Sequence, residues 1–136
     1  MYRAFEPDYP TWRREFERYD VTPHTLLVGH SCGGGFLVRW LSEHPTVRVG
    51  TVVLVAPWID PDRHLASDFM RFDLDGDLVA RTQGVHIFGS DDDGDTILRS
   101  VAILRDALPA ARYREFPGAG HFLDRTFPEL LVTLLS

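Results

Sequence analysis

A serine flanked by glycines separates an apolar run from a helical pattern in the first third of the chain. Thr25 to Val28 is predicted as a short buried strand, and Phe36 to Leu41 belongs to the helix predicted after it. Between them, residues 29–33 read Gly-His-Ser-Cys-Gly, the G-x-S-x-G pattern of a sharp strand-to-helix turn. Such a turn strains the serine backbone and exposes the hydroxyl. Side chains two positions before and after the serine would collide across the turn, which explains glycine at 29 and 33.

The remainder of the chain alternates strands with helices after a first helix predicted over Thr11 to Tyr19. The predicted strands are Thr25 to Val28, Gly50 to Ala56, Val85 to Phe88 and Arg112 to Phe116. The helix after the serine ends near His44, a second spans Thr96 to Leu108, and a last one follows a capping box over 126–129. This alternation predicts an α/β fold with parallel strands and right-handed connections. The β-branched run over 50–56 predicts a strand covered on both faces.

Composition limits the class of protein. The length of 136 residues favours a single domain over 1–136, and 44% hydrophobic with 25% charged residues is typical of a globular chain. A net charge of −6 without a Lys/Arg block argues against a nucleic-acid partner. No apolar run reaches the length of a membrane span, and residues 1–6 do not form a signal peptide. One cysteine permits no internal disulfide, which favours the cytoplasm.

No pattern predicts a metal or a cofactor. The acidic stretches 73–77 and 91–95 lack the glycine and glutamate that a calcium loop needs at its sixth and twelfth positions. We interpret them as solvated acidic loops. Four histidines have no ligand spacing for zinc; they are His24, His44, His64 and His86.

Residues 57–84 form a long segment without sustained periodicity. We predict a loop with a helical turn that lies over one end of the sheet, where a loop of this length is often functional. Its large apolar side chains either line a substrate pocket or cover the sheet. These side chains are Trp58, Phe69, Met70 and Phe72.

Three groups with complementary chemistry each follow a predicted strand directly. They are Ser31, the aspartates at 91–93 and His121, and parallel strands bring them to the same end of the sheet. Acyl transfer needs a nucleophile, a base that takes its proton and a carboxylate that orients the base. The order Ser…Asp…His along the chain is the one described for α/β-hydrolases. The same turn aims the Cys32 N–H at the space where an oxyanion would form.

These segments resemble a small α/β-hydrolase of the retinoblastoma-binding protein 9 and YdeN group. The matching pieces are residues 10–12 before a helix, GHSCGG at 29–34, VLVAPW at 53–58, FDL at 72–74, IFGSDDD at 87–93, PGAGHF at 117–122 and FPEL at 127–130. They cover nearly the whole chain in the family's order. The resemblance implies a three-layer αβα sandwich with a mostly parallel sheet and a serine hydrolase that needs no cofactor.

The resemblance also implies roles for individual residues. Ser31 is the expected nucleophile, His121 the base, and Asp92 the acid, because the family acid lies three positions after the glycine that ends its strand. Asp91 and Asp93 remain alternatives. The family turn after the paired acids is replaced here by Gly-Asp-Thr-Ile at 94–97. Candidates for lining a substrate pocket are His30, Trp58 and Phe122, with a structural role as the alternative for His30.

The chain departs from this family at its start. Relatives begin with a strand, a glycine-bearing loop and a second βα unit before the segment that starts here at Met1, and that loop supplies a second oxyanion N–H. We therefore expect an N-terminally truncated fold. The sequence is then a fragment, the product of a gene model that starts too late, or a naturally truncated protein that dimerises. The strand at 25–28 is then an apolar sheet edge open to self-association.

Two hypotheses follow for function. The first is a serine hydrolase that cleaves an ester or related small acyl substrate through Ser31, His121 and Asp92, with transfer to an acceptor other than water as a variant. The second is a catalytically inactive hydrolase-fold binding module.

Overall fold

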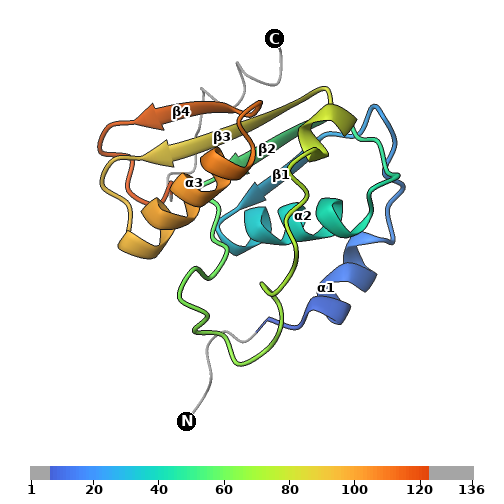
Figure 1. The fold of residues 1–136 in the computed structure, drawn as a ribbon, viewed down its shortest axis with the longest axis horizontal. Coiled ribbons are helices and arrows are strands. Elements are labelled where there is room, and N and C mark those ends of the chain that lie inside the picture. Colours follow the sequence, from blue (N-terminus) through green and yellow to red (C-terminus); the bar gives the residue numbers. More distant parts are fainter. Residues whose placement is uncertain (1–6, 123–136) are drawn as a thin grey trace.

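The computed structural model of the protein describes residues 7–122. Within them, four strands form a parallel sheet in the order β1-β2-β3-β4 (Figure 1). The strands are β1 (Leu27–His30), β2 (Thr51–Val55), β3 (Gly84–Ser90) and β4 (Arg112–Phe116). The helices are α1 (Tyr9–Phe16), α2 (Cys32–Glu43), the 3-10 helix η1 (Leu78–Arg81) and α3 (Asp95–Ala107). The predicted α/β fold with parallel strands is confirmed.

Two strands extend further toward the site than the apolar pattern predicts. β1 ends at His30 rather than Val28, and β3 ends at Ser90 rather than Phe88. Both terminal residues pair with the neighbouring strand, so polar side chains continue the ladder after the apolar run has stopped. Ser31 and the aspartates at 91–93 therefore follow the last paired residue of a strand directly, whereas residues 117–120 separate His121 from the end of β4.

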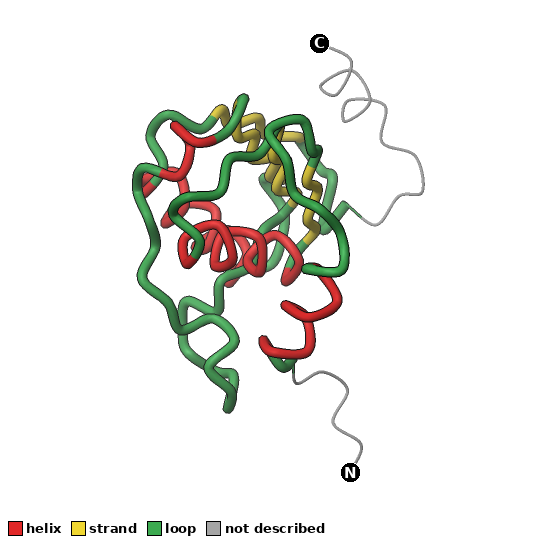
Figure 2. Tube along the Cα trace, turned by 90° about the vertical axis from the view of Figure 1, so that its right-hand side faces the viewer, coloured by secondary structure: helices red, strands yellow, loops and turns green. Residues whose placement is uncertain are grey.

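The helices lie on one side of the sheet, as the end-on view in Figure 2 shows. Side chains of α1, α2 and α3 share one apolar cluster with sheet residues such as Leu54 and Ile87. α1 packs on α2 through aromatic contacts, including Phe16 against Trp40 with ring centroids 4.8 Å apart. The helix predicted after the capping box at 126–129, which would start the other layer, lies outside the described residues.

β2 is buried from both sides, as its sequence predicts. Val52 and Leu54 belong to the cluster under the helices. Val53 and Val55 belong to a second cluster with Phe88 on the other face of the sheet. This interior strand is therefore covered by apolar side chains on both faces.

The long segment 57–84 packs mainly against α1 and α2. Phe69 is fully buried, and its ring meets the Trp12 ring edge-on with centroids 4.8 Å apart. Met70 is also buried in this cluster, and Phe72 is packed against it. These aromatic and apolar side chains belong to the core, and the η1 turn near the end of the segment is the predicted helical turn.

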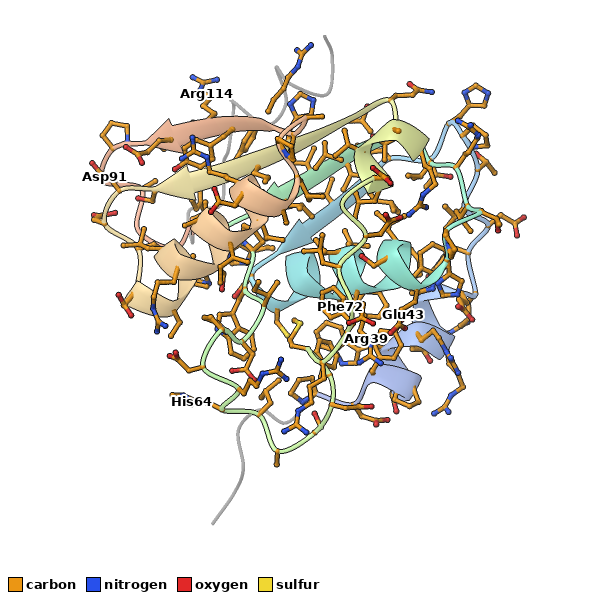
Figure 3. All side chains as sticks on the ribbon, in the orientation of Figure 1. Arg39, Glu43, His64, Phe72, Asp91 and Arg114 are labelled. Atoms are coloured by element: carbon orange, nitrogen blue, oxygen red, sulfur yellow. The ribbon has the colours of Figure 1, made fainter. Side chains whose placement is uncertain are left out.

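A buried arginine holds this segment to α2. The Arg39 guanidinium donates to the carbonyls of Asp68 at 2.6 Å and Phe69 at 2.9 Å, and it pairs with Glu43 at 3.1 Å. It also lies 3.6 Å from the centroid of the Tyr9 ring. Figure 3 shows Arg39, Glu43 and Phe72 close together beside α2. Sequence reasoning missed this role, because a buried arginine is recognisable only from the acceptors that surround it.

β1 forms one edge of the sheet within the described residues, as predicted. Val28 on this edge is 46% exposed and Leu26 just before it is 45% exposed. Self-association through residues 25–28 stays a prediction. Among the described helices, none combines the length and the apolar character required to cross a membrane.

Candidate active site

Ser31 occupies a strained turn between β1 and α2. Its backbone has φ 58° and ψ −120°, a region that non-glycine residues rarely adopt. Its N–H donates to the Val55 carbonyl at 2.9 Å, and its own carbonyl accepts from Gly34 at 3.0 Å and Trp58 at 3.0 Å. These bonds fix the strained residue from both sides, and the G-x-S-x-G turn forms as predicted.

The two glycines that flank the turn have different roles. A Cβ added at Gly29 would lie 2.7 Å from the Gly33 carbonyl carbon and from the Gly34 nitrogen, far inside contact distance. A Cβ added at Gly33 would meet nothing within 4 Å. The predicted collision is therefore confirmed at Gly29 and wrong at Gly33, because the helix backbone packs over the strand residue while the helix residue faces open space.

His121 joins the serine to a carboxylate. Its Nε2 lies 2.9 Å from the Ser31 Oγ, and its Nδ1 lies 3.0 Å from the Asp93 Oδ2. An ionised carboxylate can only accept, so Nδ1 carries the hydrogen, and in the neutral ring Nε2 is then free to accept from the serine hydroxyl. The Asp93 side chain is 4% exposed and that of His121 is 30% exposed. A buried carboxylate thus orients a ring that still reaches solvent.

The carboxylate beside His121 is Asp93, and the expected assignment to Asp92 is wrong in this respect. Asp92 Oδ1 accepts instead from the Ser90 hydroxyl at 2.6 Å and from the Gly120 N–H at 2.8 Å. The hydroxyl, and after it the Gly120 N–H, hold the pKa of Asp92 below its ordinary value. The prediction counted from Gly89, but β3 continues to Ser90. The carboxylate that His121 contacts therefore lies one residue later, two residues before the start of α3 at Asp95.

Asp91, the other alternative, accepts a hydrogen bond from a backbone amide instead of the imidazole. Its Oδ1 accepts from the Gly118 N–H at 2.8 Å. Figure 3 shows Asp91 at the carboxyl end of β3, in the segment that we call the acid loop, residues 91–94. We call residues 117–121, which follow β4, the histidine loop.

Cys32 begins α2 directly after the serine. The first N–H groups of a helix have no acceptor within the helix, so the Cys32 N–H is available to a developing oxyanion beside Ser31. Burial, and to a smaller extent the charge of Asp60, raises the pKa of the Cys32 thiol to about 12. The thiol is therefore protonated at neutral pH and is not a competing nucleophile.

The three residues predicted to line a pocket lie around the turn in different ways. The His30 Nε2 donates to the His121 carbonyl at 2.7 Å, and the two rings have centroids 4.7 Å apart. The Trp58 backbone bonds to Ser31, while its side chain packs against the main core cluster. The Phe122 ring meets the Phe116 ring edge-on at 5.6 Å. Contact of these side chains with a substrate stays a prediction.

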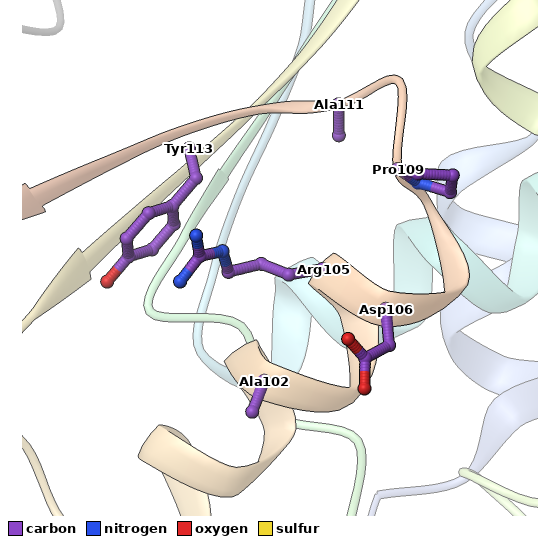
Figure 4. A pocket seen from close by; sticks show the side chains of 6 residues that line it. All are labelled: Ala102, Arg105, Asp106, Pro109, Ala111 and Tyr113. Atoms are coloured by element: carbon purple, nitrogen blue, oxygen red, sulfur yellow. The ribbon is translucent and has the colours of Figure 1, made fainter.

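An open hollow of about 660 Å³ lies between α3 and β4 and has no residue in common with the Ser31 site. Figure 4 shows the Arg105 side chain reaching toward the Tyr113 ring, whose centroid is 3.8 Å from the guanidinium carbon. The other lining residues are Ala102, Asp106, Pro109 and Ala111. Over residues 7–122, no group of three or more His, Cys, Asp or Glu side chains is arranged to hold a metal ion.

Comparison with known proteins identifies the family. The sequence matches the family described as serine hydrolase over residues 3–125, and the chain therefore belongs to the serine hydrolase family. A search of curated protein sequences gave no match.

Solved structures share the fold. The product of the ydeN gene from B. subtilis superposes with a TM-score of 0.82 at 21% identity, with 96% of this chain and 75% of that chain covered. The esterase domain of a Rhodothermus marinus protein gives a TM-score of 0.61 at 18% identity, covering 88% of this chain and 62% of that one. A carboxylesterase structure from Nitrososphaera gargenis gives a TM-score of 0.61 at 15% identity, with 93% of this chain and 70% of that chain covered. At these identities the likeness establishes the α/β-hydrolase fold, and it confirms the resemblance found in the sequence.

Proposed function

We propose that the protein is a serine hydrolase that cleaves an ester or a related small acyl substrate through Ser31, His121 and Asp93. The observation that carries this proposal is the hydrogen-bonded chain from Asp93 Oδ2 through both ring nitrogens of His121 to Ser31 Oγ, at 3.0 and 2.9 Å. Family membership and structural neighbours described as an esterase domain and a carboxylesterase support the same reaction class.

The geometry favours a two-step acyl transfer. The Ser31 Oγ attacks the substrate carbonyl carbon while His121 Nε2 takes the hydroxyl proton. Asp93 keeps the hydrogen on Nδ1 and stabilises the imidazolium. The tetrahedral intermediate collapses, and the leaving alcohol takes the proton from Nε2. A water then repeats the sequence on the acyl-serine, releasing the acid and restoring the free serine.

Charge on the substrate oxygen requires a donor, and the Cys32 N–H is our assignment for it. This N–H belongs to the residue after the nucleophile, at the start of α2, where the helix dipole also favours negative charge. Removing one donor of an oxyanion hole costs about 2.7–4 kcal/mol of barrier in other enzymes, so this backbone group is a substantial part of the proposed catalyst.

The direct test is covalent labelling with a fluorophosphonate probe together with turnover of p-nitrophenyl acetate. Wild type should be labelled at Ser31, and Ser31→Ala should lose labelling and at least ~10³-fold of kcat. Ser42→Ala is the matched control, because Ser42 lies on the same helix and its hydroxyl accepts from the Asp75 N–H. A folded wild type that stays unlabelled, with turnover equal to Ser31→Ala, would leave the binding module as the better account.

A further inference from the structure

We propose that Asp91 and Asp92 are positioning residues that hold the backbone of the histidine loop. Three consecutive aspartates would then place His121 together, two through the loop backbone and Asp93 through the imidazole ring. This inference rests on the proposed function. It concerns how the base is placed, and it assigns the stabilisation of the imidazolium to Asp93 alone.

Each aspartate takes a hydrogen bond from a different residue of the histidine loop. Asp91 accepts from the Gly118 N–H at 2.8 Å, and Asp92 accepts from the Gly120 N–H at 2.8 Å. Asp93 then accepts from the His121 ring at 3.0 Å. The order of the three donors along the histidine loop matches the order of the three acceptors, so the two loops are joined side by side.

Of the two positioning residues, Asp92 is held more firmly because its side chain also bonds to a residue of the sheet. The same Oδ1 that receives the Gly120 N–H also accepts from the hydroxyl of Ser90 at 2.6 Å. Ser90 is the last residue of β3 and is 1% exposed. A buried strand residue, a carboxylate and a loop amide thus form one continuous connection to the residue before His121.

The histidine loop needs such external support. Gly118 and Gly120 have φ values of 65° and 58°, a left-handed backbone that forms neither a helix nor a strand. The His30 Nε2 also donates to the His121 carbonyl at 2.7 Å. The backbone around His121 is therefore held by contacts with the acid loop, which follows β3, and with His30, the last residue of β1.

Positioning and charge make different demands on the side chain. To hold the Gly120 N–H, position 92 needs only an acceptor oxygen, which asparagine also offers. To stabilise an imidazolium, position 93 needs a negative charge and an acceptor for Nδ1–H. Loss of the loop contact displaces the base, and a displacement near 1 Å can cost up to about 100-fold in rate. We expect this loss to appear in kcat and not in KM, because the positioning residues do not contact the substrate.

The test compares Asp92→Ala, Asp92→Asn and Asp93→Asn in p-nitrophenyl acetate turnover. We expect Asp92→Ala to lower kcat by roughly 10- to 100-fold with KM within about twofold of wild type. Asp92→Asn should retain activity within about threefold, and Asp93→Asn should lose about 10⁴-fold. Wild-type kcat in Asp92→Ala, or equal losses in Asp92→Ala and Asp92→Asn, would overturn the proposal.

A second measurement does not depend on activity. Hydrogen exchange of the Gly120 amide, followed by NMR, should accelerate at least ~10-fold in Asp92→Ala and remain near wild type in Asp92→Asn. The Gly118 amide should respond to Asp91→Ala in the same way. We call the hydrogen bonds of Asp91 with Gly118 and of Asp92 with Gly120 the loop clamp. If the wild type has no esterase activity but these exchange rates behave as expected, the proposed function fails and the loop clamp stands. Unchanged exchange in Asp92→Ala contradicts the clamp whatever the activity.

Discussion

The serine turn is held by its own backbone, whereas the acid and histidine loops are held by side chains that reach from one loop to the other. Ser31 is fixed by main-chain bonds to β2 and to the segment after it. His121 is fixed by Asp93, by the clamp of its neighbour Gly120 and by His30. Ser31 is thus held through main-chain groups alone, whereas the position of His121 depends on side chains that reach from other segments.

If the serine turn depends on close backbone packing, a side chain at position 29 should destabilise the protein and one at position 33 should not. Gly29→Ala forces a methyl group to 2.7 Å from backbone atoms that cannot rotate away. We expect it to destabilise the protein by about 1–3 kcal/mol or more in urea unfolding.

Gly33→Ala is the matched control for this change. Its methyl group enters open space on a helix, where alanine is preferred over glycine. We therefore expect the free energy of unfolding to stay within about 1 kcal/mol of wild type and to increase rather than decrease. Equal destabilisation by the two variants would show that the turn is not limited by this contact.

Acid should remove the charge of Asp92 and the stability that it contributes, although an acceptor oxygen for the Gly120 N–H remains. The pKa of Asp92 is lowered in the folded protein, so its charge contributes stability above the unfolded value, about pH 4, and that contribution disappears as pH falls through the folded value. The difference in thermal midpoint between wild type and Asp92→Asn should therefore favour wild type at pH 6 and vanish toward pH 2. A difference that is constant over this range would contradict the account. The backbone bonds of the serine turn contain no group that titrates there.

A further prediction concerns the Cys32 thiol beside Ser31. With the pKa of Cys32 raised to about 12 by burial, alkylation by iodoacetamide at pH 8 should be at least ~100-fold slower than for the urea-unfolded chain. The rate can be measured by quantifying the remaining free thiol at successive times. A native rate equal to the unfolded rate would mean that the start of α2 is more open than described.

Sequence reasoning succeeded where local rules decide the structure. The β-branched run of β2 predicted a strand buried on both faces, and the glycine-flanked serine predicted the strained turn. It selected the wrong aspartate as the partner of His121, because β3 continues through polar Ser90 and the loop after it begins one residue later. The hold of Arg39 on the carbonyls of Asp68 and Phe69 left no pattern in the sequence, since it joins residues about 30 positions apart.

The central claim is the hydrogen bond between His121 Nδ1 and Asp93, and proton NMR tests it most directly. The account predicts a downfield Nδ1 proton resonance in wild type and in Asp92→Asn that is lost in Asp93→Asn and in His121→Ala. A resonance that survives Asp93→Asn and disappears in Asp92→Asn would contradict it.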